Sequence, residues 1–134
     1  CGEDVTGKSV DYVAGLISEK EPELINWLNN LPIFYETEDY IFVHAGLDPE
    51  IDWKHSDVKK HVWTKTREFR KIDLSEHGIT KTIVHGHVSC RNLRDNDGIR
   101  TNDFSIYKSQ DGQKIGIDGC VMKTGRINVF VFEE

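Results

Sequence analysis

The chain has 134 residues and a mass of 15.4 kDa, which is about the length of one domain. Hydrophobic residues make up 37% of it and charged residues 30%, proportions that are typical of a globular protein. No apolar run approaches the ~20 residues that a membrane-spanning helix requires. The formal net charge of -6 argues against general nucleic-acid binding, because a polyanion would be repelled. We therefore expect neither a nucleic acid nor a membrane as partner.

The first residues indicate two helices and then two strands. Apolar residues recur at helical spacing from Ser9 to Leu31. Pro22 suits the first turn of a helix but not its interior, so a first helix should end near Glu21 and a second begin at Pro22. The segments "PIFYE" and "YIFVHA" predict two short strands joined by the polar corner "TED", and "AGLDPEIDW" predicts a loop.

The middle of the chain is locally basic. A helix is predicted from about Asp57 to Phe69, with Ser56 or Asp57 as its N-cap. From Lys59 to Lys71 ("KKHVWTKTREFRK") Glu68 is the single acidic residue among six basic ones. Such a run is usually a solvated helix face. In an acidic protein it is also a place where a phosphate group could dock.

The second half is richer in strands. We expect a helical turn at 75–78, a strand from Lys81 to His85, and an exposed, turn-rich segment "CRNLRDNDGIRTND". The segments "FSIYKS", "KIGIDG" and "RINVFVFEE" predict three further strands, with "SQDGQ" as a hairpin turn between the first two. Helices that separate strands in the first half, followed by strands in the second, predict an α/β fold with a mixed sheet.

Two of the predicted strands end in histidine. His44 closes "YIFVHAGL", and "TIVHGHV" carries His85 and His87 around Gly86. Ligand sites of open α/β sheets lie at the carboxyl ends of strands, so histidines from adjacent strands could meet there at one metal ion. Gly86 would let the backbone turn or approach another group closely. Hydrogen-bonded histidines at the rim of the core are the structural alternative.

The chain taken as a whole resembles the calcineurin-like metallophosphoesterases, in particular the bacterial Ser/Thr protein phosphatase and diadenosine tetraphosphatase branch. "LPIFYETEDYIFVHAGLDP" resembles the strand pair that ends in the family's "HAG" motif. "VWTKTREF" is similar to its "WxRxxF" segment, and "TIVHGHV" to its "GH" motif. "IGIDGCVMKTGRINVFVF" is similar to its closing pair of strands. Each motif is weak alone, but the four occur in the family's order.

The resemblance implies a phosphoesterase with a dinuclear metal site that uses Mn, Fe or Zn. It makes His44 and His87 ligands of one ion. His85 would at most support these ligands from behind, without binding the ion itself. The phosphate contact falls on Lys65 or Arg67, because the tryptophan segment has one residue more than the usual spacing and has lysine where arginine is expected. Cys120 stands where a second glycine is common. The substrate would be a phosphoprotein or a nucleotide phosphate ester.

The resemblance also implies that the chain is incomplete. The family's "GDxHG", "GDxxDRG" and "GNHE" motifs, which supply the remaining ligands and the general acid, do not occur here. We therefore expect residues 1–134 to be a single partial domain, the C-terminal half of a metallophosphoesterase-type α/β sandwich. No catalytic residue is expected in this chain, whose missing partner is the N-terminal half of the same domain. A start at Cys1 agrees with this, although a lipoprotein matured at its cysteine would explain that start too.

Two other functions stay open from the residues alone. A degenerate phosphatase-like module could bind phosphorylated or protein partners without catalysis. A histidine-rich metal carrier is disfavoured, because His55, His61 and His77 have no spacing relation to the other histidines and read as surface or helix-end residues. Cys1, Cys90 and Cys120 are odd in number and far apart, which indicates reduced thiols and a cytoplasmic protein.

Overall fold

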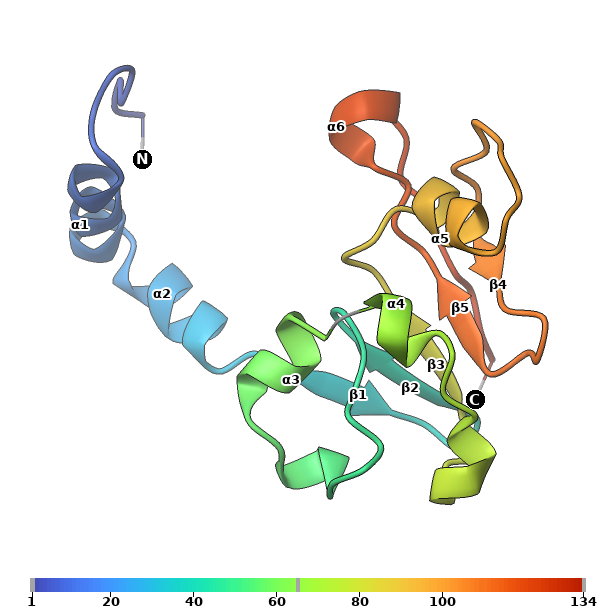
Figure 1. Ribbon diagram of the computed structural model, residues 1–134. Helices are drawn as coiled ribbons and strands as arrows, with labels where there is room; N and C mark the ends of the chain where they lie inside the picture. The colour runs from blue at the N-terminus through green and yellow to red at the C-terminus, as the bar shows by residue number, and fades with distance from the viewer. Residues whose placement is uncertain (1, 65, 134) are drawn as a thin grey trace. The chain divides into compact units, whose positions relative to one another are not determined.

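The computed structural model describes residues 2–64 and 66–133 (Figure 1). By internal contacts the chain divides into two compact units, one up to Pro32 and the other from Ile33 onward. The prediction of a single partial domain stays a prediction. None of the described helices is long and apolar enough to cross a membrane.

The first unit contains the two predicted helices. Helix α1 (Val10–Lys20) is capped by Ser9, whose hydroxyl accepts a hydrogen bond from the Tyr12 N–H at 3.2 Å. Helix α2 (Pro22–Asn29) begins at the proline, as the sequence predicted. No residue of either helix is buried.

The second unit is built on a five-stranded mixed sheet. Its strands are β1 (Phe34–Glu36), β2 (Tyr40–Val43), β3 (Thr82–His85), β4 (Tyr107–Lys108) and β5 (Lys114–Gly116), in the order β1-β2-β3-β5-β4. The three inner strands are parallel, and β1 and β4 pair antiparallel at the two edges. The predicted α/β fold with a mixed sheet is confirmed. The parallel strands β2, β3 and β5 therefore end at the same edge.

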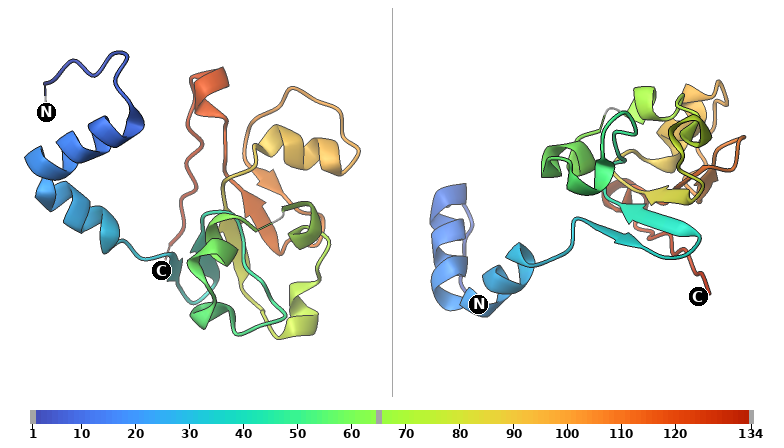
Figure 2. Two further views of the ribbon diagram at one scale, coloured as in Figure 1. Left: turned by 60° about the vertical axis from the view of Figure 1, so that its left-hand side comes forward. Right: turned by 90° about the horizontal axis from the view of Figure 1, so that it is seen from below.

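Helices cover one face of the sheet and an extended segment lies on the other (Figures 1 and 2). The first face carries α3 (Val58–Val62), α4 (Thr66–Phe69) and α5 (Cys90–Asn96), with short 3-10 turns at Trp53–His55 and Leu74–His77. A last helical turn, α6 (Val121–Thr124), follows β5. The helical turn predicted at 75–78 is confirmed, one residue earlier than expected.

The main core lies between the sheet and this helical layer. Its six buried residues come from β2, β3 and the loop and helices that pack on them: Ile41, Val43, Leu47, Phe69, Leu74 and Ile83. His61 is also fully buried there, with Nε2 3.0 Å from the Ser56 hydroxyl. Of the two positions predicted for it, surface or helix end, the second is confirmed, because His61 lies in the last turn of α3. Burial lowers the pKa of His61, which favours the neutral ring.

The opposite face of the sheet is covered by the C-terminal segment. Phe130 and Phe132 pack against Tyr40 and Phe42, with ring centroids 4.9 to 6.4 Å apart. The prediction of a strand in "RINVFVFEE" is wrong for the described residues, because none of the five strands pairs with it. The side chains of this segment nevertheless alternate between two faces, since the aromatic residues face the sheet while the residues between them are exposed.

Two further sequence predictions are corrected. The helix expected from Asp57 to Phe69 is two helices, because the backbone leaves the helical conformation at Trp63, where φ is -131°. The Thr64 hydroxyl then donates to the Lys60 carbonyl, the acceptor that a continuing helix would use at residue 64. The segment "CRNLRDNDGIRTND" is not all turn and loop, since it contains α5. Ser89 caps that helix, and only two of its residues are buried, which is too few to show a helical period in the sequence.

We predict that Gly116→Ala destabilises the second unit by about 1–3 kcal/mol, because overpacking a filled core forces side chains off their rotamers. A Cβ on Gly116 would stand 2.3 Å from Cδ1 of Leu93, a side chain that is only 1% exposed. Chemical denaturation measures the change. Gly15→Ala is the control: a Cβ there meets nothing within 4 Å, so it should not destabilise. An unchanged midpoint for Gly116→Ala would contradict the close packing of α5 on β5.

A second prediction concerns acid stability. The Asp73 carboxylate accepts hydrogen bonds from the Gln113 side chain and from Ser75, which lower its pKa from 3.8 to about 2. A depressed folded-state pKa stabilises the fold above the unfolded value of 3.8, and this stabilisation is lost as the pH falls through 3.8 toward 2. Asp73→Asn should therefore melt at lower temperature than wild type at pH 6, with the difference shrinking toward pH 2.

Thermal melting at a series of pH values tests this. Glu19→Gln, an exposed change in α1, is the control and should shift the melting curve little at any of them. A difference between Asp73→Asn and wild type that stayed constant from pH 6 to pH 2 would contradict the assignment.

Candidate functional site

Two histidine side chains meet where two parallel strands end. His44 directly follows β2, and His87 comes two residues after β3. The His44 Nε2 and His87 Nδ1 atoms lie 3.2 Å apart, and the ring centroids 5.1 Å apart. The structure thus brings together the two histidines that the sequence singled out. Their role as metal ligands stays a prediction.

Backbone hydrogen bonds hold the loops that carry this pair. The Gly86 N–H donates to the His44 carbonyl at 2.8 Å, which ties the end of β3 to the end of β2. The Cys90 N–H donates to the Asp118 carbonyl at 2.8 Å, which joins the loop after β3 to the loop after β5. The positions of both histidines are therefore set by continuations of the parallel ladder.

The turn between β3 and α5 strains a histidine rather than using a glycine. Gly86 has no positive φ, and a Cβ there would lie at an ordinary 3.6 Å from the His44 carbonyl oxygen. His87 itself adopts the left-handed region, with φ of 64°. This conformation costs a non-glycine residue roughly 1–2 kcal/mol and is concentrated at functional sites. The expectation that Gly86 supplies the turn is therefore wrong, and the unusual residue is His87.

Trp63 packs on the histidine pair from the end of α3. Its ring meets the His87 ring edge to face, with centroids 5.3 Å apart and an interplanar angle of 85°. The Trp63 side chain is nevertheless 72% exposed. A large aromatic ring that is open to solvent beside two imidazoles offers a contact surface to a ligand.

His85 does not join the pair. It is 2% exposed, its ring packs edge to face on Phe69, and its Nδ1 lies 3.2 Å from the Gly86 carbonyl oxygen. Burial lowers its pKa, so the neutral form is favoured. The sequence pattern His-Gly-His does not place both rings on one face, because the strand ends at His85 and the backbone reverses at His87.

The pair fits a metal ion as two of its ligands. Two nitrogens bound to one ion at about 2.1 Å lie roughly 3.0–3.4 Å apart for right-angle to tetrahedral geometry, and the observed separation is 3.2 Å. Both imidazoles can ligate in their neutral form. In the part of the chain that the structure describes, no cluster of three or more His, Cys, Asp or Glu side chains could hold an ion. Any ion here would need further ligands from elsewhere.

The predicted phosphate contact cannot be placed. Lys65 lies outside the described residues. Arg67 belongs to α4, which begins three residues after Trp63, and its side chain is not described. Of the cysteines in the described chain, Cys90 is buried and Cys120 half-buried, and both are free thiols. Cys120 occupies its turn with φ of 53°, a left-handed conformation that a glycine would adopt without strain.

Trp63, whose ring contacts His87, also lines a cavity of about 470 Å³. The loop after His44 and the segment from α3 to just beyond α4 form its walls. The lining residues are Leu47, Asp48, Pro49, Glu50, Lys60, Trp63, Thr64, Glu68, Phe69 and Ile72.

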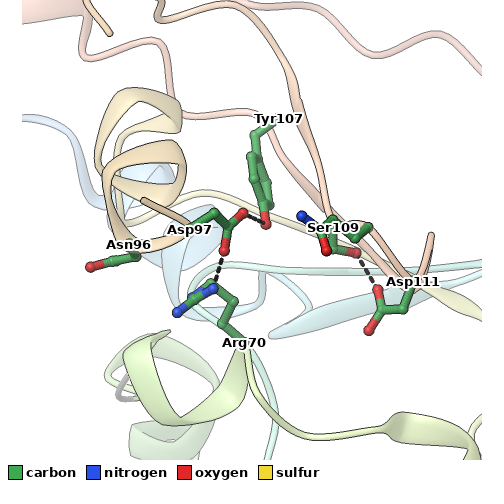
Figure 3. Close-up of a pocket in the computed structure, with 7 residues that line it drawn as sticks. Arg70, Asn96, Asp97, Tyr107, Ser109 and Asp111 are labelled. Atoms are coloured by element: carbon green, nitrogen blue, oxygen red, sulfur yellow. Dashed lines mark hydrogen bonds and ion pairs between the residues drawn. The ribbon is translucent and has the colours of Figure 1, made fainter. Parts of the chain in front are cut away.

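A second, polar cavity lies between α4, α5 and the β4–β5 hairpin (Figure 3). Arg70 points to Asp97 and pairs with one carboxylate oxygen, while the Tyr107 hydroxyl donates to the other at 2.6 Å. Burial, and then the Asp97 carboxylate, raise the pKa of Tyr107, which keeps the hydroxyl protonated as a donor. The Asp97 carboxylate thus has a partner at each oxygen, although the Arg70 Nε atom is buried without a hydrogen-bond partner. The cluster is a structural tie between three elements.

Sequence reasoning missed both cavities. Each cavity is lined by an ion pair whose partners are far apart in the sequence: Asp48 with Lys60 in the first, and Arg70 with Asp97 in the second. These partners meet only through the packing of α3, α4 and α5 on the sheet. Trp63 belongs to the "VWTKTREF" motif, but nothing in the spacing of that motif indicates contact with His87. No pattern in the sequence could have found these pairs.

No family model, curated protein or solved structure matches this chain.

We predict that Asp97→Asn costs about 2–4 kcal/mol of unfolding free energy, because it leaves the Arg70 guanidinium poorly paired with little access to water. The Arg70 and Asp97 side chains are only 19% and 11% exposed. Asp95→Asn is the matched control on the same helix: its pair with Arg91 is about one third exposed, so the loss should stay below ~0.5 kcal/mol. Equal effects of the two changes in urea denaturation would contradict the structural tie.

Proposed function

We propose that this chain is the C-terminal part of a metal-dependent phosphoesterase of the calcineurin-like type, with a metallophosphoesterase-type α/β sandwich completed by an N-terminal half. The observation that carries the proposal is the 3.2 Å separation of His44 Nε2 and His87 Nδ1 at the carboxyl ends of parallel strands. Ligand sites of open α/β sheets lie at this edge. The two free thiols of the described chain agree with a cytoplasmic location.

His44 and His87 would hold one of two divalent ions, Mn, Fe or Zn, with the remaining ligands supplied by the missing half. Two such ions supply a deprotonated water as nucleophile and neutralise the phosphoryl oxygens. The contribution of this chain would be to orient the two imidazole ligands. The Gly86–His44 backbone bond and the left-handed conformation of His87 accompany the 3.2 Å approach of the two ring nitrogens. Trp63 packs edge to face against the His87 ring.

Lys65 or Arg67 would contact the substrate phosphate, a phosphoprotein or nucleotide phosphate ester. Both belong to the basic segment from Lys59 to Lys71, which also contains Trp63. Arginine would grip a phosphate through two parallel N–H donors, and lysine through a single charge. With two metal ligands and no general acid, the 134 residues alone should not turn over substrate.

A non-catalytic module that binds phosphorylated or protein partners is the second candidate. It is favoured by the same 3.2 Å distance, because one imidazole N–H can donate to the other ring's nitrogen without any metal. The two proposals differ in whether the histidine pair binds an ion.

Zinc titration of the purified chain by calorimetry tests the first proposal. Wild type should bind weakly, with a dissociation constant on the order of 10–100 μM, since two imidazoles make a partial site. His44→Ala and His87→Ala should each weaken binding by at least about tenfold. His55→Ala is the control, because its exposed ring pairs with Asp52 and should not matter. Unchanged zinc affinity in both site variants would leave the non-catalytic module as the better reading.

A further inference from the structure

We propose that Trp63 is a positioning residue for the candidate metal site: its indole ring fixes the plane of the His87 imidazole, so that Nδ1 stays directed at His44. The inference rests on the proposed function and adds a residue to it. Trp63 would act through His87 and would bind no ion itself, because the indole nitrogen is a hydrogen-bond donor only.

The backbone at His87 is held in a tight turn. The Val88 N–H donates to the Gly86 carbonyl at 2.7 Å, and His87, the residue between them, has a φ of 64°. A hydrogen bond between residues two apart around a positive φ is the rarer and more strained form of the γ-turn. The buried His85 ring lies against the same carbonyl, with Nδ1 3.2 Å from its oxygen. The turn therefore fixes where the His87 side chain starts, but it leaves the imidazole free to rotate.

The plane of the His87 ring is set by its aromatic neighbours. The torsion about the Cβ–Cγ bond of histidine has broad minima, so the backbone cannot determine this plane. The His44 ring lies at 5.1 Å and 62° to the His87 ring, and the Trp63 ring at 5.3 Å and 85°. A nearly perpendicular contact is a preferred arrangement of aromatic rings. Rotation of the imidazole out of this plane would separate its Nδ1 from the His44 Nε2, which now lie 3.2 Å apart.

Trp63 is anchored to the loop that carries His44. Its N–H donates to the Lys59 carbonyl at 2.9 Å, at the carboxyl end of α3. The His61 carbonyl, two residues before Trp63, accepts a hydrogen bond from the Ala45 N–H at 2.8 Å, and Ala45 directly follows His44. The end of α3 is thus fastened to one of the two histidines. An aromatic ring carried there is a fixed reference against which the other histidine can be oriented.

The exposure of Trp63 separates this role from a role in the core. The ring is 72% exposed, so its removal would leave no cavity in the packed interior. Substitutions at exposed positions usually change the free energy of unfolding little. The geometry therefore predicts a loss of order at His87 without a comparable loss of folding stability.

Zinc titration of the complete chain by calorimetry is the first test. Trp63→Ala should weaken zinc binding about threefold to tenfold, the loss expected when one aromatic pair is removed. Trp63→Phe keeps a ring at this position and should stay within about twofold of wild type. Trp27→Ala is the matched control, because it removes another exposed indole, from α2 in the other unit. The urea midpoint of Trp63→Ala should stay close to that of wild type.

The mobility of the histidine rings in the metal-free chain is the second test, measured by NMR relaxation of their ring carbons. The order parameter of the His87 ring should be high in wild type and should fall in Trp63→Ala toward that of His55, whose side chain is 83% exposed. Trp63→Phe should restore it and Trp27→Ala should not change it. An order parameter for His87 that stayed at the wild-type value in Trp63→Ala would overturn the inference. A loss of zinc affinity that only follows a loss of folding stability would overturn it too.

The metal-free measurement separates this inference from the proposed function. If wild type binds no zinc but the His87 ring becomes mobile in Trp63→Ala, the metal site fails and the orienting contact of Trp63 stands. If wild type binds zinc and His44→Ala weakens that binding, while Trp63→Ala leaves the affinity unchanged, the proposed function stands and the role of Trp63 is overturned.

Discussion

The parallel pairing of β2 with β3 is the constraint on which the candidate site depends. Val43 and His85 are register partners, so both strands stop at the same level of the sheet. The Gly86–His44 backbone bond extends this alignment by one step beyond the strands. Without it, the two imidazoles would be carried by independent loops, and their 3.2 Å approach would have no structural support.

The helical layer gives the site its surroundings. The break between α3 and α4 turns Trp63 outward against His87 and starts a new helix toward the buried Phe69. The Thr64 hydroxyl that replaces a helical N–H at the Lys60 carbonyl is thus part of what shapes this region.

On the far side of α4, the Arg70–Asp97–Tyr107 cluster ties the helical layer to β4. Its charges are neutralised internally, so it contributes to the rigidity of the helical layer rather than to recognition. α5 begins three residues after His87, and Asp97 caps the carboxyl end of that helix. The same tie therefore restrains both sides of the candidate site. Ion pairs with as little exposure as this one, 19% and 11%, are costly to break, whatever their net contribution to stability.

Local patterns were enough to predict most elements of the fold. Pro22 marked a helix start, alternating apolar residues marked the strands, and histidines at two strand ends marked the edge where they meet. Packing decided the rest. α5 buries only Cys90 and Leu93 and so shows no helical period in the sequence. Phe130 and Phe132 alternate like a strand although no described strand pairs with their segment. The contacts of Trp63 with its neighbours also have no local signature, because they join residues that only the sheet and its helices bring side by side.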